Sequence, residues 1–463
     1  MKRRMSLIPL MFLVVLCSRP ASAQLSITLG QTSTNTSPSS TASGVVVRTT
    51  LGLPGLQLVC LLKGCTVAGN LDGNLNHVYL VRPVQGLLPD LLAGVLRLVT
   101  GIVDAEVDQV VTIPASPSDQ AQASAPPGEL WDTEPVSYYG TTVPEGYVEQ
   151  PAAQIIHVAQ AHSAFNVSGN GIIADIDTGV DPNHPALHGA LLAGYDFTRN
   201  QPGGSEMTDV GQPSGSSCSS SNPCDPAYVN QHTAAMLDQH TAAMVDGDGT
   251  NYAAFGHGTM VAGILHLVAP TAKIMPLKSF HADGTANLSD IIRAVYYAVQ
   301  NHANVINMSF NLTAPSQELT SAINYASNGN VICVASSGND GKEEVVYPAA
   351  LPNVMGTAST SNSDQRSTFS NYGDKIVWIA APGEAIITSY PFGFYAAGRG
   401  TSFSSPLVAG TASLIVNMVP VSNQNIAAWA IGHAKWIGPD MGEGRLDIYE
   451  SLSAINPVAG LLN

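Results

Sequence analysis

Residues 172–179 read Ile-Ile-Ala-Asp-Ile-Asp-Thr-Gly, a short and mostly apolar run that ends in an acid and a turn signal. A run of this length before a glycine indicates a buried strand, which we expect over residues 172–176. Asp177 would then stand at the carboxyl end of that strand. In open α/β sheets the functional groups gather at these ends. The stretch therefore predicts a buried strand and a candidate functional acid.

The same pattern continues outward from this strand, from about residue 154. Short apolar runs alternate with segments whose apolar residues recur at helical spacing, as in residues 288–302. Strands that alternate with helices indicate a mostly parallel sheet covered on both faces. We therefore expect a doubly wound α/β fold. The other expected helices are 257–267 and 318–327, and the other expected strands are 272–280, 305–308 and 331–335.

Three glycine-flanked segments carry the residue types of nucleophilic catalysis. They are Asp-Thr-Gly at 177–179, Gly-His-Gly-Thr at 256–259 and Gly-Thr-Ser-Phe-Ser-Ser-Pro at 400–406. A serine hydroxyl needs a base to take its proton, and an imidazole titrates near the working pH. The imidazole in turn needs an acceptor on its other nitrogen. The predicted catalytic residues are Asp177, His257 and Ser402.

A fourth segment, Ser-Ser-Gly-Asn-Asp-Gly at 336–341, follows the expected strand 331–335. The amide of Asn339 can donate to an oxyanion, together with the N–H of a serine at a helix N-terminus. Asp175 is the alternative triad acid, because it points to the same side of the strand as Asp177. The Thr-Gly context favours Asp177, and we expect Asp175 to be a supporting polar group.

With these residues the chain resembles the subtilisin-like serine peptidases, whose catalytic residues occur in the order Asp, His, Ser. The resemblance covers about residues 155–455, and further matching segments are 260–263, 305–309, 369–373, 380–383 and 444–447. The family's glutamate-containing relatives, the sedolisins, are disfavoured by His257 and Asn339. Met260, Asn311 and Leu312 depart from the common family pattern, which leaves the subsite preference open.

The resemblance implies a subtilisin-like fold and a serine endopeptidase that acts through an acyl-enzyme. It implies no cofactor for the chemistry and protein or peptide substrates. It also implies a groove that holds the substrate as an added strand, lined by Ser309, Phe310, Asn311, Ser337 and Gly338. Two alternatives are a catalytically silent, secreted binding module and an esterase. The esterase alternative lacks support, because no Gly-x-Ser-x-Gly motif surrounds Ser402 in this chain.

The N-terminal region predicts export and maturation. A basic start, an apolar stretch and Ala-Ser-Ala before Gln24 indicate a signal peptide over residues 1–23. Residues 24–120 are interpreted as a small α+β prodomain and linker, an intramolecular inhibitor of a self-processed zymogen. Residues 121–463 would form the peptidase domain, with a surface insertion at about 200–250. We expect self-cleavage between about residues 111 and 131, after an extended run at 107–113.

The net charge limits the kinds of partner that we expect, and the cysteines indicate which disulfides could form. With 18 basic and 34 acidic residues the net charge is −16, which disfavours nucleic acid and membrane surfaces as partners. In an oxidising compartment the close pairs Cys60/Cys65 and Cys218/Cys224 are candidate disulfides, while Cys333 is expected to be a buried apolar residue.

The expected insertion holds two further features. Residues 246–249 (Asp-Gly-Asp-Gly) are a turn or a structural calcium site, since calcium is a common stabiliser in the family. Residues 231–246 contain a tandem repeat of eight residues, which we expect to be a duplicated surface loop.

Overall fold

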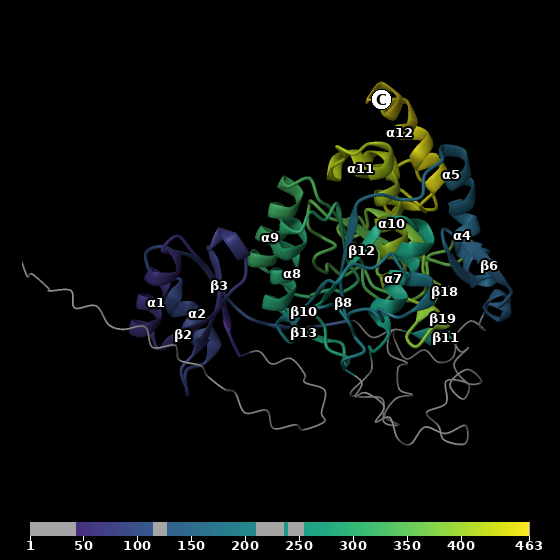
Figure 1. Ribbon diagram of the computed structural model, residues 1–463. Coiled ribbons are helices and arrows are strands. Elements are labelled where there is room, and N and C mark those ends of the chain that lie inside the picture. The colour runs from purple at the N-terminus through teal and green to yellow at the C-terminus, as the bar shows by residue number, and fades with distance from the viewer. Residues whose placement is uncertain (1–42, 114–126, 210–235, 239–253, 463) are drawn as a thin grey trace, which may run out of the picture. The chain divides into compact units, whose positions relative to one another are not determined.

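The computed structural model describes residues 43–113, 127–209, 236–238 and 254–462 (Figure 1). All of them belong to one compact unit, residues 36–463. The predicted signal peptide, residues 114–126 of the expected linker, the Cys218/Cys224 pair and the calcium candidate lie outside these ranges. Within the described residues, no helix has the length and apolarity needed to cross a membrane.

An eight-stranded sheet is the centre of the α/β part, residues 127–462. Its strand order is β10-β9-β12-β8-β14-β15-β16-β17, and all neighbours pair in parallel except β9 and β10. The strands are β8 (Ile172–Asp177), β9 (Tyr195–Asp196), β10 (Gln201–Pro202), β12 (Lys273–Lys278), β14 (Val305–Met308), β15 (Ile332–Ser336), β16 (Met355–Thr360) and β17 (Ile379–Pro382). Because β8 pairs with both β12 and β14, the strand predicted from residues 172–176 lies inside the sheet.

Helices cover both faces of this sheet, as Figure 1 shows. On one face lie α7 (His257–Val268) and α10 (Thr401–Met418), and on the other lie α8 (Leu288–Gln300) and α9 (Gln317–Asn328). Adjacent strand residues face opposite clusters: Ile173 packs with the first pair of helices and Ala174 with the second. This alternation is what a doubly wound sheet requires. The predicted fold class is confirmed.

The remaining elements of the α/β part surround this core. Strands β18 and β19 form a hairpin, and α11 and α12 end the chain. The elements are β6 (Pro135–Tyr138), β7 (Thr141–Pro144), α3 (Glu145–Val148), α4 (Pro151–Ile155), α5 (Val158–Phe165), β13 (Thr285–Asn287), β18 (Ile386–Tyr390), β19 (Phe394–Arg399), α11 (Gln424–Ile431) and α12 (Ile448–Leu462).

The expected surface insertion at about 200–250 is not all loop. Strand β11 (Met236–Asp238), three residues of the first repeat copy, pairs in parallel with β19. Glu206, which also lies in this region, is completely buried. Charge alone does not place a residue at the surface when buried donors satisfy it.

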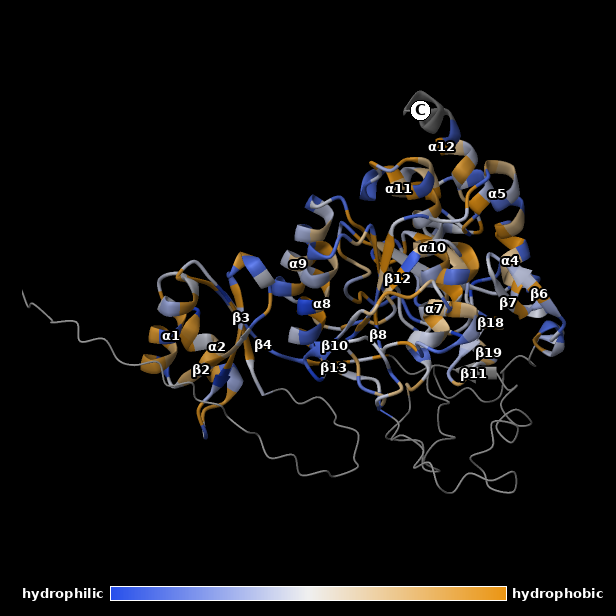
Figure 2. Cartoon of the chain, in the orientation of Figure 1, coloured by the Kyte–Doolittle hydropathy of each residue, from blue (hydrophilic) through white to orange (hydrophobic). Residues whose placement is uncertain are grey.

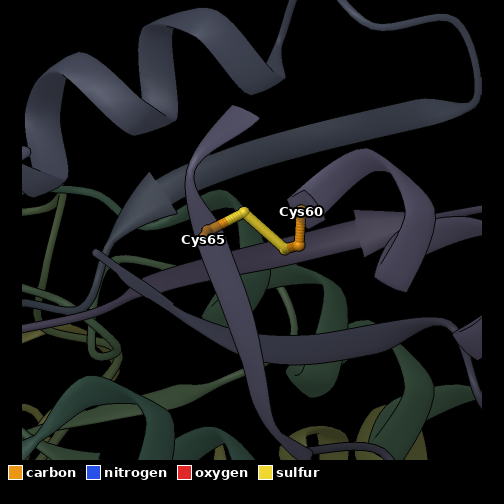
Figure 3. The surroundings of a disulfide bond; sticks show 2 residues. All are labelled: Cys60 and Cys65. Atoms are coloured by element: carbon orange, nitrogen blue, oxygen red, sulfur yellow. A yellow bond between two sulfur atoms is a disulfide. The ribbon is translucent and has the colours of Figure 1, made fainter. Parts of the chain in front are cut away.

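The N-terminal lobe, residues 43–113, has its own antiparallel sheet in the order β2-β3-β1-β4. Its elements are β1 (Val45–Thr49), α1 (Gly52–Lys63), β2 (Cys65–Asn70), β3 (Val78–Pro83), α2 (Pro89–Leu96) and β4 (Ile102–Val107). Val45, Leu56 and Leu92 belong to a separate buried cluster between this sheet and the helices. A Cys60–Cys65 disulfide joins the last turn of α1 to the first residue of β2 (Figure 3). The predicted local disulfide is therefore present.

The lobe ends in an extended segment that differs from the prediction. The run at 107–113 was expected to be one strand, but β4 ends at Val107 and a new strand, β5 (Val110–Thr112), begins after a break. At the break, Asp108 turns toward Ser289, whose N–H and hydroxyl both donate to its carboxyl group at 2.8 Å. Strand β5 then pairs with β13.

Candidate active site

Asp177 is the last residue of β8, and its side chain meets the first residue of α7. The distance from Asp177 Oδ1 to His257 Nδ1 is 2.7 Å, and the side chains of both residues are buried. The N–H of Thr178 donates to the same Oδ1 atom at 2.6 Å. The structure thus places the predicted residues Asp177 and His257, which are 80 positions apart in the sequence, in direct contact.

Glycines are needed here because two backbone segments approach closely. A Cβ atom at Gly258 would lie 2.1 Å from the carbonyl oxygen of Gly179, which no side chain tolerates. Gly256, the N-cap of α7, has φ +91°, in the left-handed region that favours glycine. The glycines on both sides of His257 thus allow α7 to begin directly against the turn after Asp177.

Ser402 lies in the first turn of α10, behind Gly400. Its hydroxyl donates to the carbonyl oxygen of Ser309 at 3.1 Å. The next residue, Phe403, lies with its ring centre 5.8 Å from that of His257, and α10 packs against α7. His257 Nε2 is buried and has no hydrogen-bond partner among the residues that the structure describes. The imidazole ring of His257 is therefore beside the helix that carries Ser402.

Asn339 follows β15 and is completely buried. Its Oδ1 atom accepts hydrogen bonds from the N–H and the hydroxyl of Thr401, each at 2.9 Å. Because Thr401 immediately precedes Ser402, these two bonds fix the amide beside the serine. With the oxygen held in this way, the amide nitrogen is the end of the side chain that can serve as a donor.

Asp175 occupies a different environment from Asp177. Its Oδ1 accepts from Asn307 Nδ2 at 3.0 Å, and the same nitrogen lies 3.0 Å from the hydroxyl of Ser309. Burial, and then the charge of Asp177, raise the pKa of Asp175 well above its ordinary value. Asp175 is therefore a buried hydrogen-bonding group behind the site, and the carboxyl group that His257 Nδ1 contacts is that of Asp177.

The residues expected to line a substrate groove follow β14 and β15, and they differ in what they present. The Ser309 hydroxyl donates to the carbonyl oxygen of Ser402 at 3.0 Å, and the Phe310 ring packs in the core, 5.1 Å from that of Phe280. The hydroxyl of Ser337 donates to the Asn371 carbonyl oxygen at 3.3 Å. These three residues can therefore offer only their main chain to a substrate.

Asn311 and Gly338 face each other across this region. Asn311 forms an isolated antiparallel bridge with Thr112 of the N-terminal lobe. Gly338 has φ +95°, and a Cβ atom there would lie 2.7 Å from Asn311 Nδ2. Glycine is thus required at position 338 by both backbone conformation and space.

Sequence reasoning missed three residues of the site. Thr401 orients Asn339, and its place directly before Ser402 was a usable signal. Asn371 accepts at Oδ1 from the N–H groups of Asp340 and Lys342, which shapes the loop after Asn339. Glu206 bonds to residues beside Asp177 and His257, and no pattern in the sequence distinguished it.

Buried ionisable groups show how strongly the interior disfavours charge. Burial raises the pKa of Glu206 to about 8 and that of Cys333 to about 12. Cys333 is fully buried and unpaired with another cysteine, as the sequence indicated for an apolar role. Within the described part of the chain, no group of three or more His, Cys, Asp or Glu side chains is arranged to hold a metal ion.

Comparison with known proteins agrees with this architecture. The family model described as the subtilase family matches residues 169–438. Thermitase of Thermoactinomyces vulgaris is 31% identical over 308 residues, covering 63% of this chain and 93% of thermitase. Subtilisin BL of Lederbergia lenta is 37% identical over 174 residues, covering 36% of this chain and 64% of that protein. Among solved structures, a lanthipeptide protease matches with TM-score 0.52 at 21% identity, over 66% of this chain and 95% of that one.

A doubly wound sheet, with an Asp–His pair and a serine-bearing helix at its carboxyl edge, defines a serine hydrolase of the α/β class. The chain belongs to the subtilase family. It is therefore a subtilisin-like serine endopeptidase, and the binding-module alternative is not favoured.

Proposed function

We propose that Asp177, His257 and Ser402 are the catalytic triad of a secreted endopeptidase that is made as a self-processed zymogen. The observation that carries this proposal is the buried 2.7 Å bond between Asp177 and His257, beside the helix that presents Ser402. The order of the three residues along the chain is that of the subtilases.

The proposed chemistry has two halves. In the first, Ser402 Oγ bonds to the substrate's carbonyl carbon while His257 Nε2 takes the hydroxyl proton, and the same proton then goes to the leaving amine as the C–N bond breaks. In the second half, a water molecule gives a proton to His257 Nε2 as its oxygen bonds to the acyl carbon, and His257 returns that proton to Ser402 Oγ as the ester C–O bond breaks and the acid product leaves. Asp177 holds the imidazole in the tautomer that keeps Nε2 as acceptor and stabilises the cation that forms.

Two donors would stabilise the oxyanion in each half. Thr401 donates to the oxygen of Asn339, so the amide nitrogen is the end that would donate toward the reacting carbonyl. The N–H of Ser402 stands in the first turn of α10, at the positive end of the helix dipole. Loss of one such donor costs about 10²–10³ in turnover, a magnitude measured on a subtilisin.

The substrate chain would bind as an extra strand. The edge of β13 and the backbone at Asn311 are both paired with the segment β5, so this part of the molecule accepts extended backbone. The main chain at Ser309, Phe310, Ser337 and Gly338 would complete the groove. We therefore propose protein or peptide substrates, with selectivity set by the depth of the subsites near Asn311.

The N-terminal lobe would be the prodomain and the intramolecular inhibitor. Glu106 accepts hydrogen bonds from the N–H groups of Gln317 and Glu318 at the start of α9, and Asp108 does the same at the start of α8. Carboxylates at helix N-termini are favourable caps. Val46 and Leu319 also share one buried cluster. These contacts would hold β5 in the groove until cleavage.

Export and calcium binding complete the proposal. Secretion rests on the signal-peptide pattern of residues 1–23, and the prodomain and linker would end at about residue 120. No cofactor takes part in the proposed chemistry. Structural calcium is proposed only at residues 246–249, and a fall in melting temperature on chelation would support it.

The test of this function is the maturation of the secreted chain. Wild type should lose its N-terminal lobe by cleavage between about residues 111 and 131, and Ser402→Ala should accumulate with the lobe attached. Intact mass and N-terminal sequencing measure both products. Asp175→Asn is the control and should be processed. Wild type that hydrolyses peptides while full length would contradict the zymogen, and wild type without peptidase activity would contradict the triad.

A further inference from the structure

Glu206 lies after β10 (Gln201–Pro202) and is completely buried. Its carboxyl group collects three donors from two other segments. Thr178 Oγ1 and Gly256 N donate to Oε2 at 3.0 and 2.8 Å, and the Thr259 hydroxyl donates to Oε1. A buried acid with three short-range donors is a built polar site, and it costs free energy if any partner is removed.

The directions of these bonds follow from the other contacts of the two threonines. Thr178 Oγ1 accepts from the N–H of Gly258 at 2.9 Å, and Thr259 Oγ1 accepts from the N–H of Asp181 at 2.8 Å. Each hydroxyl has one proton, which is therefore left to donate to Glu206. The carboxyl group accepts in all three bonds, which is the pattern of an ionised carboxylate.

The three donors stand directly beside the proposed triad. Thr178 follows Asp177 in the sequence, and Gly256 precedes His257. These two segments are 80 residues apart, and the bond between Asp177 and His257 is useful only if both are held in one geometry. Glu206 contacts both at once.

The segment that carries Glu206 is itself fixed to the turn after β8. The N–H of Val180 donates to the carbonyl oxygen of Gly204 at 2.9 Å, and the N–H of Glu206 donates to that of Val180 at 3.4 Å. Val180 and Ser205 form an isolated parallel bridge. The backbone that carries the Glu206 carboxylate is thus held in place by hydrogen bonds to the turn after β8.

We propose that Glu206 is a positioning residue of this endopeptidase. Its carboxylate clamps the turn after Asp177 to the first turn of α7, so that His257 Nδ1 stays on Asp177 while the proton moves at Nε2. The role rests on the proposed triad and adds a third segment to it.

The ionisation of Glu206 supplies a separate readout. Burial raises its pKa to about 8, and its hydrogen bonds and Lys278 act in the opposite direction. A protonated Glu206 would need an acceptor for its O–H, whereas Thr178, Gly256 and Thr259 all donate to it. The clamp should therefore weaken as pH falls below about 8. The other titratable groups around it are Asp175, Asp177, His257, Lys278 and Tyr390.

The test compares Glu206→Gln with a matched buried acid. Glutamine keeps the shape but places an N–H₂ group against a donor, so kcat should fall about 10- to 100-fold. KM should stay within about twofold, because no groove residue bonds to Glu206. The kcat profile of wild type should contain a limb near pH 8 that Glu206→Gln lacks. Asp447→Asn replaces one of the two carboxylate oxygens that lie 3.0 Å from His157 Nδ1, so it should lower the melting temperature and leave kcat unchanged.

A second pair of variants covers poor folding of Glu206→Gln. Thr259→Val removes one donor to Glu206 and should lose kcat, and Thr259→Ser restores the hydroxyl and should recover most of it. The positioning role is wrong if Glu206→Gln has the kcat and the pH profile of wild type, or if Asp447→Asn loses as much kcat as Glu206→Gln. If Glu206→Gln does not fold, a wild-type kcat in Thr259→Val would contradict the role. An inactive wild type would instead contradict the triad on which the role rests.

Discussion

The N-terminal lobe and the α/β part differ in how completely they bury their apolar residues. In the α/β part, every residue of α7 from His257 to Val268 is buried. In the lobe, Leu98, Leu61 and Leu62 are 86%, 79% and 73% exposed, and Figure 2 shows hydrophobic colour across α1 and α2. A small unit buries a smaller fraction of its surface. We therefore expect the lobe, taken alone, to be less stable than the α/β part.

The polar groups of the two regions differ as well. Those of the α/β part are deeply buried and bonded to one another, as Asp175, Asn307 and Ser309 are. Those of the lobe reach outward, since Glu106 and Asp108 bind the first turns of α9 and α8. The polar groups of one region thus bond mainly to one another, whereas carboxylates of the other cap helices outside it.

The largest expected effect separates the two acids of β8. Asp177→Asn should lower kcat by about 10⁴, because the imidazole is then held in the wrong tautomer. Asp175→Asn keeps an acceptor for Asn307 and should change kcat by less than about tenfold. Steady-state kinetics on a peptide substrate measure both. Equal losses would show that the acid of the triad has been assigned wrongly.

Asp175 should also make the α/β part less stable at high pH. Its folded-state pKa is raised, so folding takes up a proton once pH exceeds the ordinary value of 3.8. Stability is then lost as pH rises, by up to about 1.4 kcal/mol per pH unit until the folded pKa is reached. Asp175→Asn removes this loss and should gain in melting temperature relative to wild type between pH 5 and 9. A constant difference across that range would contradict the account.

The lobe should depend on its disulfide. Cys60 and Cys65 close a short loop, so Cys60→Ser should lower the unfolding free energy of the lobe by about 2 kcal/mol. Amide hydrogen exchange in the unprocessed Ser402→Ala chain measures this, and reduction of that chain should have the same effect. Exchange that rises equally in α7 would show that the two regions do not differ in self-sufficiency.

The smallest expected effect concerns docking. Asp108→Asn weakens the cap on α8 by about 1 kcal/mol, roughly a fivefold faster release of the cleaved lobe. The control is Asp104→Asn, whose partner Arg97 lies in the lobe itself. Recovery of activity after cleavage follows the release. Identical release rates for the two variants would show that Asp108 does not help to hold the lobe on the α/β part.

Much of the site could be predicted because close backbone contacts demand glycine. Gly258 is needed where α7 meets Gly179, so the sequence around His257 carries a visible mark. The break between Val107 and Val110 could not be predicted, because Asp108 leaves the sheet to cap a helix of the other region. The role of Glu206 could not be predicted from the sequence either, since its hydrogen-bond donors come from segments that only folding brings together.

The central claim, that Ser402 is activated by His257, can be tested by covalent labelling. A phosphonyl fluoride reacts with an activated serine by forming an O–P bond and releasing fluoride. Processed wild type should gain one label, mapped by peptide mass to Ser402. His257→Ala, whose N-terminal lobe is first removed by added wild-type enzyme that is then separated from it, should gain none at the same reagent concentration. A label on another serine, or equal labelling of Ser402 in His257→Ala, would contradict the account.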